Sequence, residues 1–263
     1  MVEEGYLAAK TSWVTYGEGI RAFLATPQRW SAPYRGMILC HERYGLVKHT
    51  LDLAARFASY GYACIAPDFA SNWDGDKEAL NRGDARLGIG QDEVRFIMSA
   101  SLDYLTGLPE VDADRCAAMG VCMSGGYPWL LNSIRKDVAA NICVYGGAGT
   151  SEDVLREVTA PSLVVFGERD HGTSVEKMQA MRQRLEGLNK SYDFRIFEDG
   201  PHGFLNDTMP GRYRQKEAEA AWALTLDFLD RVYAGYYRPE RLRWRFESNV
   251  AVDYDFSKNV RLE

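Results

Sequence analysis

The segment MGVCMSGG, residues 119–126, is where we expect a buried strand to turn sharply into a helix. The apolar run 116–119 precedes it, and YPWLL at 127–131 has the apolar character of a first helical turn. Gly120 and Ser124 stand two residues before and after Cys122. Small residues are needed there because the backbones of strand and helix nearly touch. The segment therefore predicts a nucleophile elbow with a strained Cys122 at its tip, where the helix N-terminus favours an anion such as a thiolate.

Two other interpretations of this segment stay open at this point. Cys122 fits equally well as a buried structural cysteine beside a glycine-rich helix start, because cysteine is among the most buried residue types. Ser124 is a weaker candidate nucleophile, since Cys122 and not glycine stands two residues before it.

The length, composition and net charge are those of an ordinary globular protein and exclude several classes of function. The chain has 263 residues, of which 46% are apolar and 26% charged. A formal net charge of −6 argues against general nucleic-acid binding. No stretch resembles a signal peptide or a membrane span, and four of the five cysteines lie in apolar strand-like runs without metal-ligand spacing. We expect a cytoplasmic protein with no cofactor, no metal and no nucleic-acid or membrane partner.

Strand-like and helix-like segments alternate along most of the chain. We expect a hairpin at 12–26, strands at 36–40, 62–66, 116–119, 139–145, 162–166 and 192–197, and helices at 50–60, 91–105, 175–188 and 217–233. This alternation predicts an α/β fold, a mostly parallel twisted sheet with helices on both faces.

One long connection interrupts the alternation. Residues 69–87 are polar and rich in turn-forming residues, and they include Trp73, Arg82 and Arg86. Long loops in compact domains often bind ligands or act as lids, while the alternative is a surface excursion without function.

The character of the chain changes after residue 234, so we expect a domain at 1–234 and a C-terminal extension at 235–263. Arginines alternate there with Leu242, Trp244 and Phe246, and a second alternating run follows at 250–256. This pattern predicts a hairpin or extended arm that packs on its own core or reaches a neighbouring subunit, which makes it a candidate for homo-oligomer formation.

Three polar residues follow three separate predicted strands, in the order Cys122, Asp170, His202. Nucleophile, acid and histidine occur in this order in α/β-hydrolases. His202 would accept the thiol proton, Asp170 would orient the imidazole, and Cys122 would attack a carbonyl carbon to form a thioester. Taken singly, Asp170 also fits a helix N-cap and His202 also fits a turn residue. Glu168 and His171 lie nearby in the sequence and are alternative candidates for the acid and the histidine.

A further polar pair follows the strand predicted at 36–40. We expect His41 to be structural. Glu42 is either a partnered carboxylate at the carboxyl end of the sheet, where open α/β sheets place their chemistry, or a solvated loop residue.

The sequence resembles the dienelactone hydrolase family over about residues 15–231. The matching segments are HERYGL at 41–46, APD at 66–68, GVCMSGG at 120–126, GERD at 167–170, PHGF at 201–204, and AAW and LDFL at 220–222 and 226–229 in the last helix. The cysteine elbow separates this family from serine hydrolases.

The resemblance implies an α/β-hydrolase fold and hydrolysis of a carboxylic ester or lactone. It implies Cys122 as nucleophile, with Asp170 and His202 as its partners. It also implies that Glu42 contacts the thiol and that the backbone N–H groups of Arg43 and Met123 hold the oxyanion.

The chain departs from the family where dienelactone hydrolases bind a substrate carboxylate. Ser71 and Asn206 stand about where the family has arginines, and Arg82, Arg86, Arg212 or Arg214 are possible substitutes. Isomerisation, C–C bond hydrolysis or ligand binding without catalysis on the same scaffold are alternatives, because fold does not fix chemistry.

Overall fold

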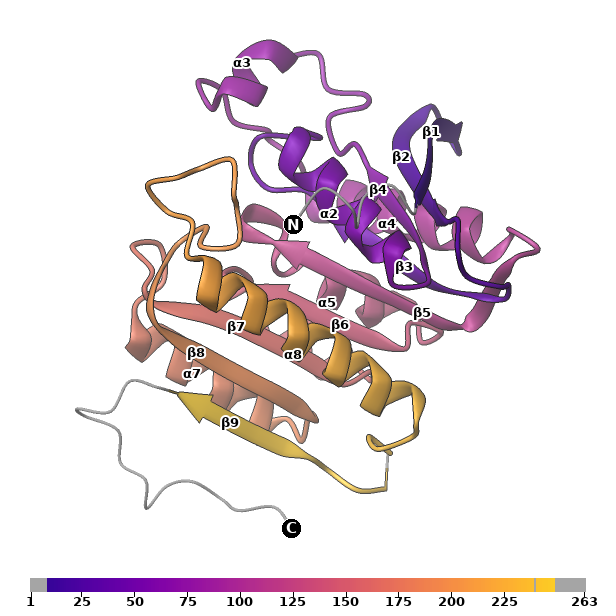
Figure 1. Cartoon of the computed structure of the whole chain (residues 1–263). Coiled ribbons are helices and arrows are strands. Elements are labelled where there is room, and N and C mark those ends of the chain that lie inside the picture. Colours follow the sequence, from indigo (N-terminus) through magenta and orange to yellow (C-terminus); the bar gives the residue numbers. More distant parts are fainter. Residues whose placement is uncertain (1–8, 239, 249–263) are drawn as a thin grey trace.

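The computed structural model describes residues 9–238 and 240–248, which form a nine-stranded sheet covered by helices on both faces (Figure 1). The strand order is β1-β2-β4-β3-β5-β6-β7-β8-β9. Strand β2 is antiparallel to both of its neighbours, and all pairs from β4 to β9 are parallel. The predicted α/β architecture with a mostly parallel sheet is confirmed.

Most of the predicted elements lie close to their predicted limits, but the strand expected at 116–119 begins already at Val111, and a helix at Glu152–Glu157 was not expected. The strands are β1 Ala9–Tyr16, β2 Ile20–Pro27, β3 Tyr34–Cys40, β4 Tyr62–Pro67, β5 Val111–Val121, β6 Ala140–Val144, β7 Ser162–Arg169, β8 Tyr192–Pro201 and β9 Trp244–Ser248. The helices are α2 Lys48–Ser59, α3 Lys77–Arg82, α4 Gln91–Thr106, the 3₁₀ turn η1 Cys122–Ser124, α5 Tyr127–Ile134, α6 Glu152–Glu157, α7 Val175–Gly187 and α8 Gln215–Tyr233.

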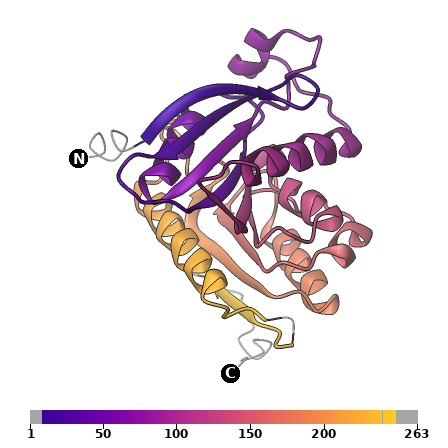
Figure 2. The same cartoon turned by 90° about the vertical axis from the view of Figure 1, so that its right-hand side faces the viewer.

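The helices form two layers. Helices α2 and α8 lie on one face of the sheet and α4, α5 and α7 on the other, as the two views at right angles show (Figures 1 and 2). The strands between these layers are covered on both sides, which explains their continuous apolar runs. All six residues of β4 are buried. Cys40, Cys64, Cys116 and Cys143 are free and buried, as predicted for core residues.

The connection at 69–87 contains a helix that sequence analysis did not predict. Helix α3 is six residues long, and a capping residue stands at each of its ends. The Asp76 carboxylate accepts a hydrogen bond from the Ala79 N–H at 2.9 Å, and Gly83 ends the helix in the left-handed conformation at φ +85°. A helix this short has no apolar periodicity in its sequence. Its capping residues, aspartate and glycine, are also typical of turns, so the sequence predicted turns here. Figure 1 shows α3 projecting beyond the edge of the sheet.

The first part of the C-terminal extension belongs to the sheet. Strand β9 pairs parallel with β8, with Trp244 opposite Tyr192 and Ser248 opposite Ile196. The Trp244 indole N–H donates to the Lys190 carbonyl at 3.0 Å. The second alternating run, 250–256, lies outside the described residues.

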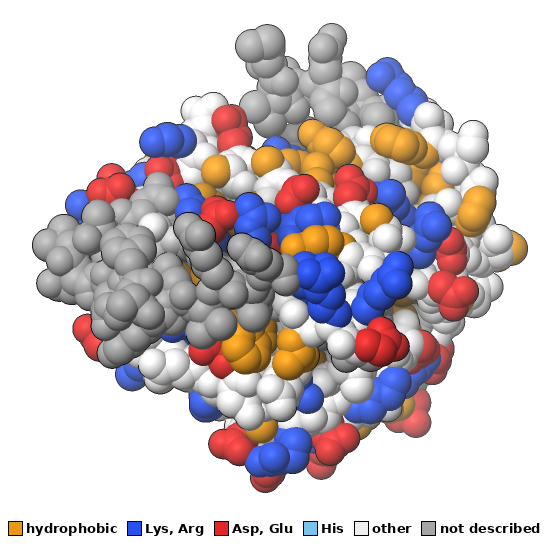
Figure 3. Space-filling model, turned by 90° about the horizontal axis from the view of Figure 1, so that it is seen from below, with side chains coloured by type: hydrophobic (Ala, Val, Ile, Leu, Met, Phe, Trp, Pro, Cys, Tyr) orange, Lys and Arg blue, Asp and Glu red, His pale blue; other side chains and the backbone are white. Residues whose placement is uncertain are grey.

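On the face seen from below, positively and negatively charged side chains are interspersed (Figure 3). On β9, Arg245 pairs with Glu247 at 2.6 Å, and both side chains are about half exposed. Exposed pairs of this kind contribute about 0–1 kcal/mol each, so they define a solvated surface more than a source of stability. Among the described residues, no helix has both the length and the apolar character of a membrane span.

Candidate active site

The elbow after β5 has the strained geometry that the sequence predicted. Cys122 has φ +60°, a left-handed conformation that is rare for residues with a Cβ. A Cβ on Gly120 would lie 2.0 Å from the Ser124 carbonyl oxygen, and one on Gly125 would lie 2.5 Å from the Gly146 Cα. A Cβ on Gly146 would in turn lie 2.1 Å from the Cys122 carbonyl oxygen, so all three glycines are required by the close approach of backbone to backbone that holds Cys122 at the tip of the turn.

Ser124 has a structural position beneath this turn. Its side chain is fully buried, and its oxygen accepts a hydrogen bond from the Val121 N–H at 3.0 Å. The hydroxyl also lies 3.0 Å from the Cys40 carbonyl, which ties the elbow to β3. Cys122, by contrast, is half-buried, and it is the one cysteine among the five that is not buried.

The ends of β5, β7 and β8 bring Cys122, Asp170 and His202 together. His202 Nε2 lies 3.0 Å from the Cys122 sulfur, and His202 Nδ1 lies 2.9 Å from Asp170 Oδ2. The other carboxylate oxygen of Asp170 accepts from the N–H groups of Gly172 and Thr173 at 2.7 and 3.0 Å. Asp170 is thus fixed by its own loop and in turn fixes the imidazole.

The charge state of His202 follows from these contacts. Burial lowers the pKa of His202, but its hydrogen bonds to Asp170 and Cys122 outweigh burial and raise the pKa from 6.5 to about 10. The ring therefore carries a proton at neutral pH, and an imidazolium at 3.0 Å stabilises negative charge on the sulfur. The rival His171 is exposed and has its ring 5.3 Å from that of His202.

Glu42 is a buried and fully partnered carboxylate, so the alternative of a solvated loop residue is wrong. Its side chain accepts a hydrogen bond from the Tyr145 hydroxyl at 3.1 Å and from the Asn206 amide at 2.6 Å. Burial and the nearby charge of Glu42 hold the pKa of Tyr145 well above its usual value, so this hydroxyl stays a neutral donor. Glu42 is only 3% exposed.

His41 is structural, as predicted. Its Nδ1 lies 2.7 Å from the Glu42 carbonyl, and its Nε2 accepts from the Phe69 N–H at 3.1 Å. Burial lowers the pKa of His41, so the ring stays neutral and joins the loop after β3 to the loop after β4.

Sequence reasoning missed two residues of this site. Tyr145 was predicted only as the end of a strand, and Asn206 only as a position that lacks an arginine. In the structure Tyr145 has φ +34° and its ring lies 5.1 Å from that of His202. A tyrosine at the carboxyl end of a buried strand was the available signal, because that edge of the sheet is where site residues gather.

Comparison with known proteins assigns the family. The model of the dienelactone hydrolase family matches residues 20–233, which is most of the chain. The chain belongs to the dienelactone hydrolase family.

The relatives and structural neighbours agree with this assignment. A Yersinia pestis protein named "Putative carboxymethylenebutenolidase" is 25% identical over 236 residues, which cover 85% of this chain and 88% of that protein. A dienelactone hydrolase-like promiscuous phosphotriesterase from metagenomic libraries superposes with a TM-score of 0.73 at 21% identity, over 86% of this chain and 99% of that one. An acylaminoacyl peptidase of Pyrococcus horikoshii gives 0.63 at 16% identity, over 85% of this chain and 41% of that one.

These likenesses show that this dienelactone hydrolase family member has the α/β-hydrolase fold. The confirmed fold places the ends of β5, β7 and β8 at one edge of the sheet. The assignment to a family of hydrolases comes from the family model, independently of the geometry of Cys122 and His202.

The two positions where dienelactone hydrolases were expected to carry arginines are occupied by residues with local roles. The Ser71 hydroxyl donates to the Asp68 carbonyl at 2.6 Å and accepts from the Arg21 N–H at 2.9 Å. Asn206 bonds Glu42. Neither supplies a positive charge for a substrate.

The candidate substrate-binding residues lie in two groups. Arg212 packs beside the site, since its Cδ lies 3.5 Å from where a Cβ on Gly203 would be, next to His202. Arg82 is exposed and paired with Asp84 at 3.0 Å, and Arg86 is exposed on the same connection. Trp73 is partly buried and packs its ring over Gly75.

Proposed function

We propose that this protein hydrolyses a carboxylic ester or lactone, with Cys122 as nucleophile, His202 as general base and acid, and Asp170 as the group that orients His202. The observation that supports this most is the continuous set of contacts from sulfur to imidazole to carboxylate, 3.0 and 2.9 Å long. A nucleophile within reach of a base that a third group orients is the arrangement of covalent acyl transfer.

The proposed reaction has two halves. Cys122 reacts as a thiolate paired with the His202 imidazolium, which holds the proton of the thiol, and the sulfur attacks the substrate carbonyl carbon. The tetrahedral intermediate expels the alkoxide, which takes the proton from His202, and a thioester remains. Water then gives a proton to His202 and attacks the thioester, so that the acid is released and the thiol is restored.

The oxyanion of both intermediates needs donors beside the sulfur. We assign these to the backbone N–H groups of Met123, which follows Cys122, and of Arg43, which follows Glu42. Each such donor is worth about 10²–10³ in rate. The Arg43 guanidinium donates to the Gly83 carbonyl at 2.6 Å, which anchors the segment that carries this N–H.

The proposed role of Glu42 is taken from the family. There a carboxylate helps to accept the thiol proton once substrate is bound. Tyr145 and Asn206 each use one lone pair of the Glu42 carboxylate, and each oxygen keeps another with which to accept a proton. These two donors also make Glu42 rigid, so its position relative to Cys122 is set by the fold.

Among the candidate residues, Arg212 is the first choice for binding the substrate. It lies beside the Gly203 backbone next to His202, so a carboxylate on the substrate could pair with it near the reacting bond. Trp73, Arg82 and Arg86 come from the connection that carries α3 and are secondary candidates.

A panel of aryl esters and lactones tests this function. Replacing Cys122 by Ala should lower turnover by a factor on the order of 10⁶. The matched control is Cys143→Ala, a buried core cysteine on β6, which should retain wild-type turnover. Equal turnover in the two variants would contradict the assignment, and products without ¹⁸O from labelled water would favour isomerisation.

A further inference from the structure

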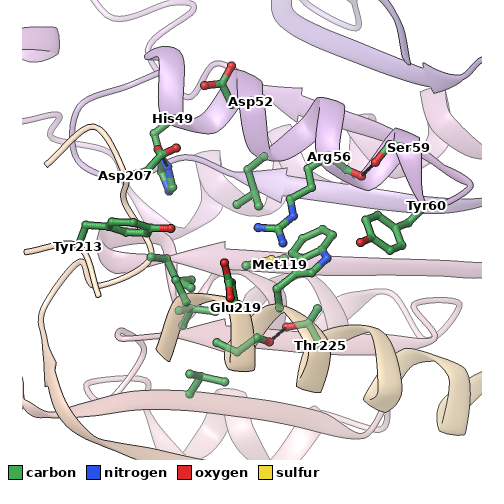
Figure 4. A pocket seen from close by; sticks show the side chains of 17 residues that line it. His49, Asp52, Arg56, Ser59, Tyr60, Met119, Asp207, Tyr213, Glu219 and Thr225 are labelled. Carbon is green, nitrogen blue, oxygen red and sulfur yellow. Dashed lines mark hydrogen bonds and ion pairs between the residues drawn. The ribbon is translucent and has the colours of Figure 1, made fainter. Parts of the chain in front are cut away.

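A cavity lies between α2 and α8, and Figure 4 shows the side chains that line it. Its volume is about 330 Å³, within the range of small-molecule sites. Met119, Val144 and Val165, from the adjacent strands β5, β6 and β7, contribute to its lining. Cys122 and His202 are not among the lining residues.

Two buried polar atoms on the cavity wall have no hydrogen-bond partner within the described residues. These atoms are Trp222 Nε1 and His49 Nε2, and each residue is only 6% exposed. Buried polar groups in native proteins are almost always hydrogen-bonded, so these two atoms are available to bond a molecule that occupies the cavity. His49 Nδ1 lies 3.5 Å from Asp207 Oδ1, which makes Nε2 of a neutral ring the acceptor.

A positive charge lies next to one of these atoms. The Arg56 guanidinium is 4.3 Å from the centroid of the Trp222 ring, and Figure 4 shows it directed into the cavity. No carboxylate oxygen of the described residues lies within 4.0 Å of it. The carboxylates that line the cavity have other partners: Asp52 bonds Lys48, Asp207 pairs with His49, and Glu219 accepts from Gln215.

These carboxylates do not prevent an anion from binding at Arg56. Glu219 is exposed and the Asp207 side chain is 47% exposed, so water and salt screen their repulsion. Arg56 is half-buried, where a charge–charge contact is screened less.

We propose that this cavity binds a small carboxylate with an apolar body and a hydroxyl at its far end. The carboxylate pairs with Arg56 and accepts from the Trp222 N–H, and the hydroxyl donates to His49 Nε2. Arg56 and His49 are seven residues apart on α2, about 10 Å along the helix axis. This separation along the helix leaves room for an aromatic ring between the two polar groups, over the apolar floor of the cavity.

The cavity also adjoins the candidate active site through one segment. Leu205 and Asp207 line the cavity, while Asn206 between them bonds Glu42. Carboxylate binding has to be distinguished from occupation of the active site beside Arg212.

Isothermal titration calorimetry with 4-hydroxyphenylacetate tests the proposal. We expect one saturable site, and binding of the neutral 4-hydroxyphenylacetamide about 10-fold weaker or more. Arg56→Gln should weaken binding of the acid about 10-fold or more, and Arg56→Lys should restore part of it. Trp222→Phe keeps the ring but removes the N–H, and should weaken binding about 3- to 10-fold.

The matched control is Arg212→Gln, which should leave the affinity for 4-hydroxyphenylacetate unchanged. Thermal unfolding midpoints within error of wild type would show that the variants are folded. The proposal is overturned if no saturable binding occurs, if the amide binds as tightly as the acid, or if affinity survives Arg56→Gln. Loss of binding in Arg212→Gln would place the ligand in the active site instead.

Discussion

Replacing Asp170 by Asn tests the electrostatic account of His202 most stringently. The rise of the His202 pKa from 6.5 to about 10 corresponds to roughly 5 kcal/mol in favour of the imidazolium. The hydrogen bonds to Asp170 and Cys122 cause this rise against the opposing effect of burial. Loss of the Asp170 charge should remove roughly half of it, so the pKa should fall by about two pH units, with turnover lower by a factor on the order of 10⁴.

The assay is an NMR titration of the ring C–H signals of the four histidines. Cys122→Ala should also lower the His202 pKa, because the sulfur is the second partner of the ring. Asp207→Asn is the control, since it removes a carboxylate from His49 and not from His202. Titration of His202 near 6.5 in the wild-type protein, unchanged by Asp170→Asn, would show that Asp170 does not raise the pKa of His202.

The same pair predicts how stability depends on pH. A histidine whose pKa is raised on folding contributes stability that is fully present below pH 6.5 and lost as pH rises through about 10. The difference in unfolding free energy between wild type and Asp170→Asn, measured in urea, should therefore be constant below pH 6.5 and shrink toward pH 10. A difference that grew with pH would contradict the assigned direction of the shift.

Two further substitutions affect residues that hold Glu42 and the elbow in place. Asn206→Leu should lower the unfolding free energy by about 1–3 kcal/mol in urea titrations, because it leaves one oxygen of the buried Glu42 unpaired; an unchanged value would mean that water replaces the amide. Gly120→Ala should destabilise the fold by at least about 1–3 kcal/mol, because its Cβ would lie 2.0 Å from the Ser124 carbonyl oxygen. Gly149→Ala is the control, since a Cβ there meets nothing within 4 Å, and equal thermal unfolding of the two variants would contradict this explanation.

The parts of this protein that local sequence determines were predictable. The elbow depends on a few small residues around Cys122, and the positions of Asp170 and His202 follow from strands that the apolar pattern reveals. What the pattern could not show depends on contacts between distant segments. Tyr145 and Asn206 are 103 and 164 residues from Glu42 in the sequence, so nothing near Glu42 indicated its two donors.

The extension and the cavity between α2 and α8 illustrate the same limit. Alternation around Trp244 predicted a strand, but the alternation of one strand does not specify its partner, and β9 pairs with β8. The cavity arises because α2 and α8 lie side by side over three strands, and its unpartnered atoms, Trp222 Nε1 and His49 Nε2, become evident only in that arrangement.

Trapping the acyl-enzyme shows whether Cys122 is the residue that attacks the substrate. Wild-type protein mixed with a slowly hydrolysed aryl ester is quenched in acid within milliseconds and analysed by mass spectrometry. If Cys122 is the nucleophile, the peptide that contains Cys122 gains the mass of the acyl group, hydroxylamine removes that mass, and the Cys122→Ala variant does not show it. Ester turnover with the acyl group on Ser124, or turnover that persists unchanged in Cys122→Ala, would contradict it.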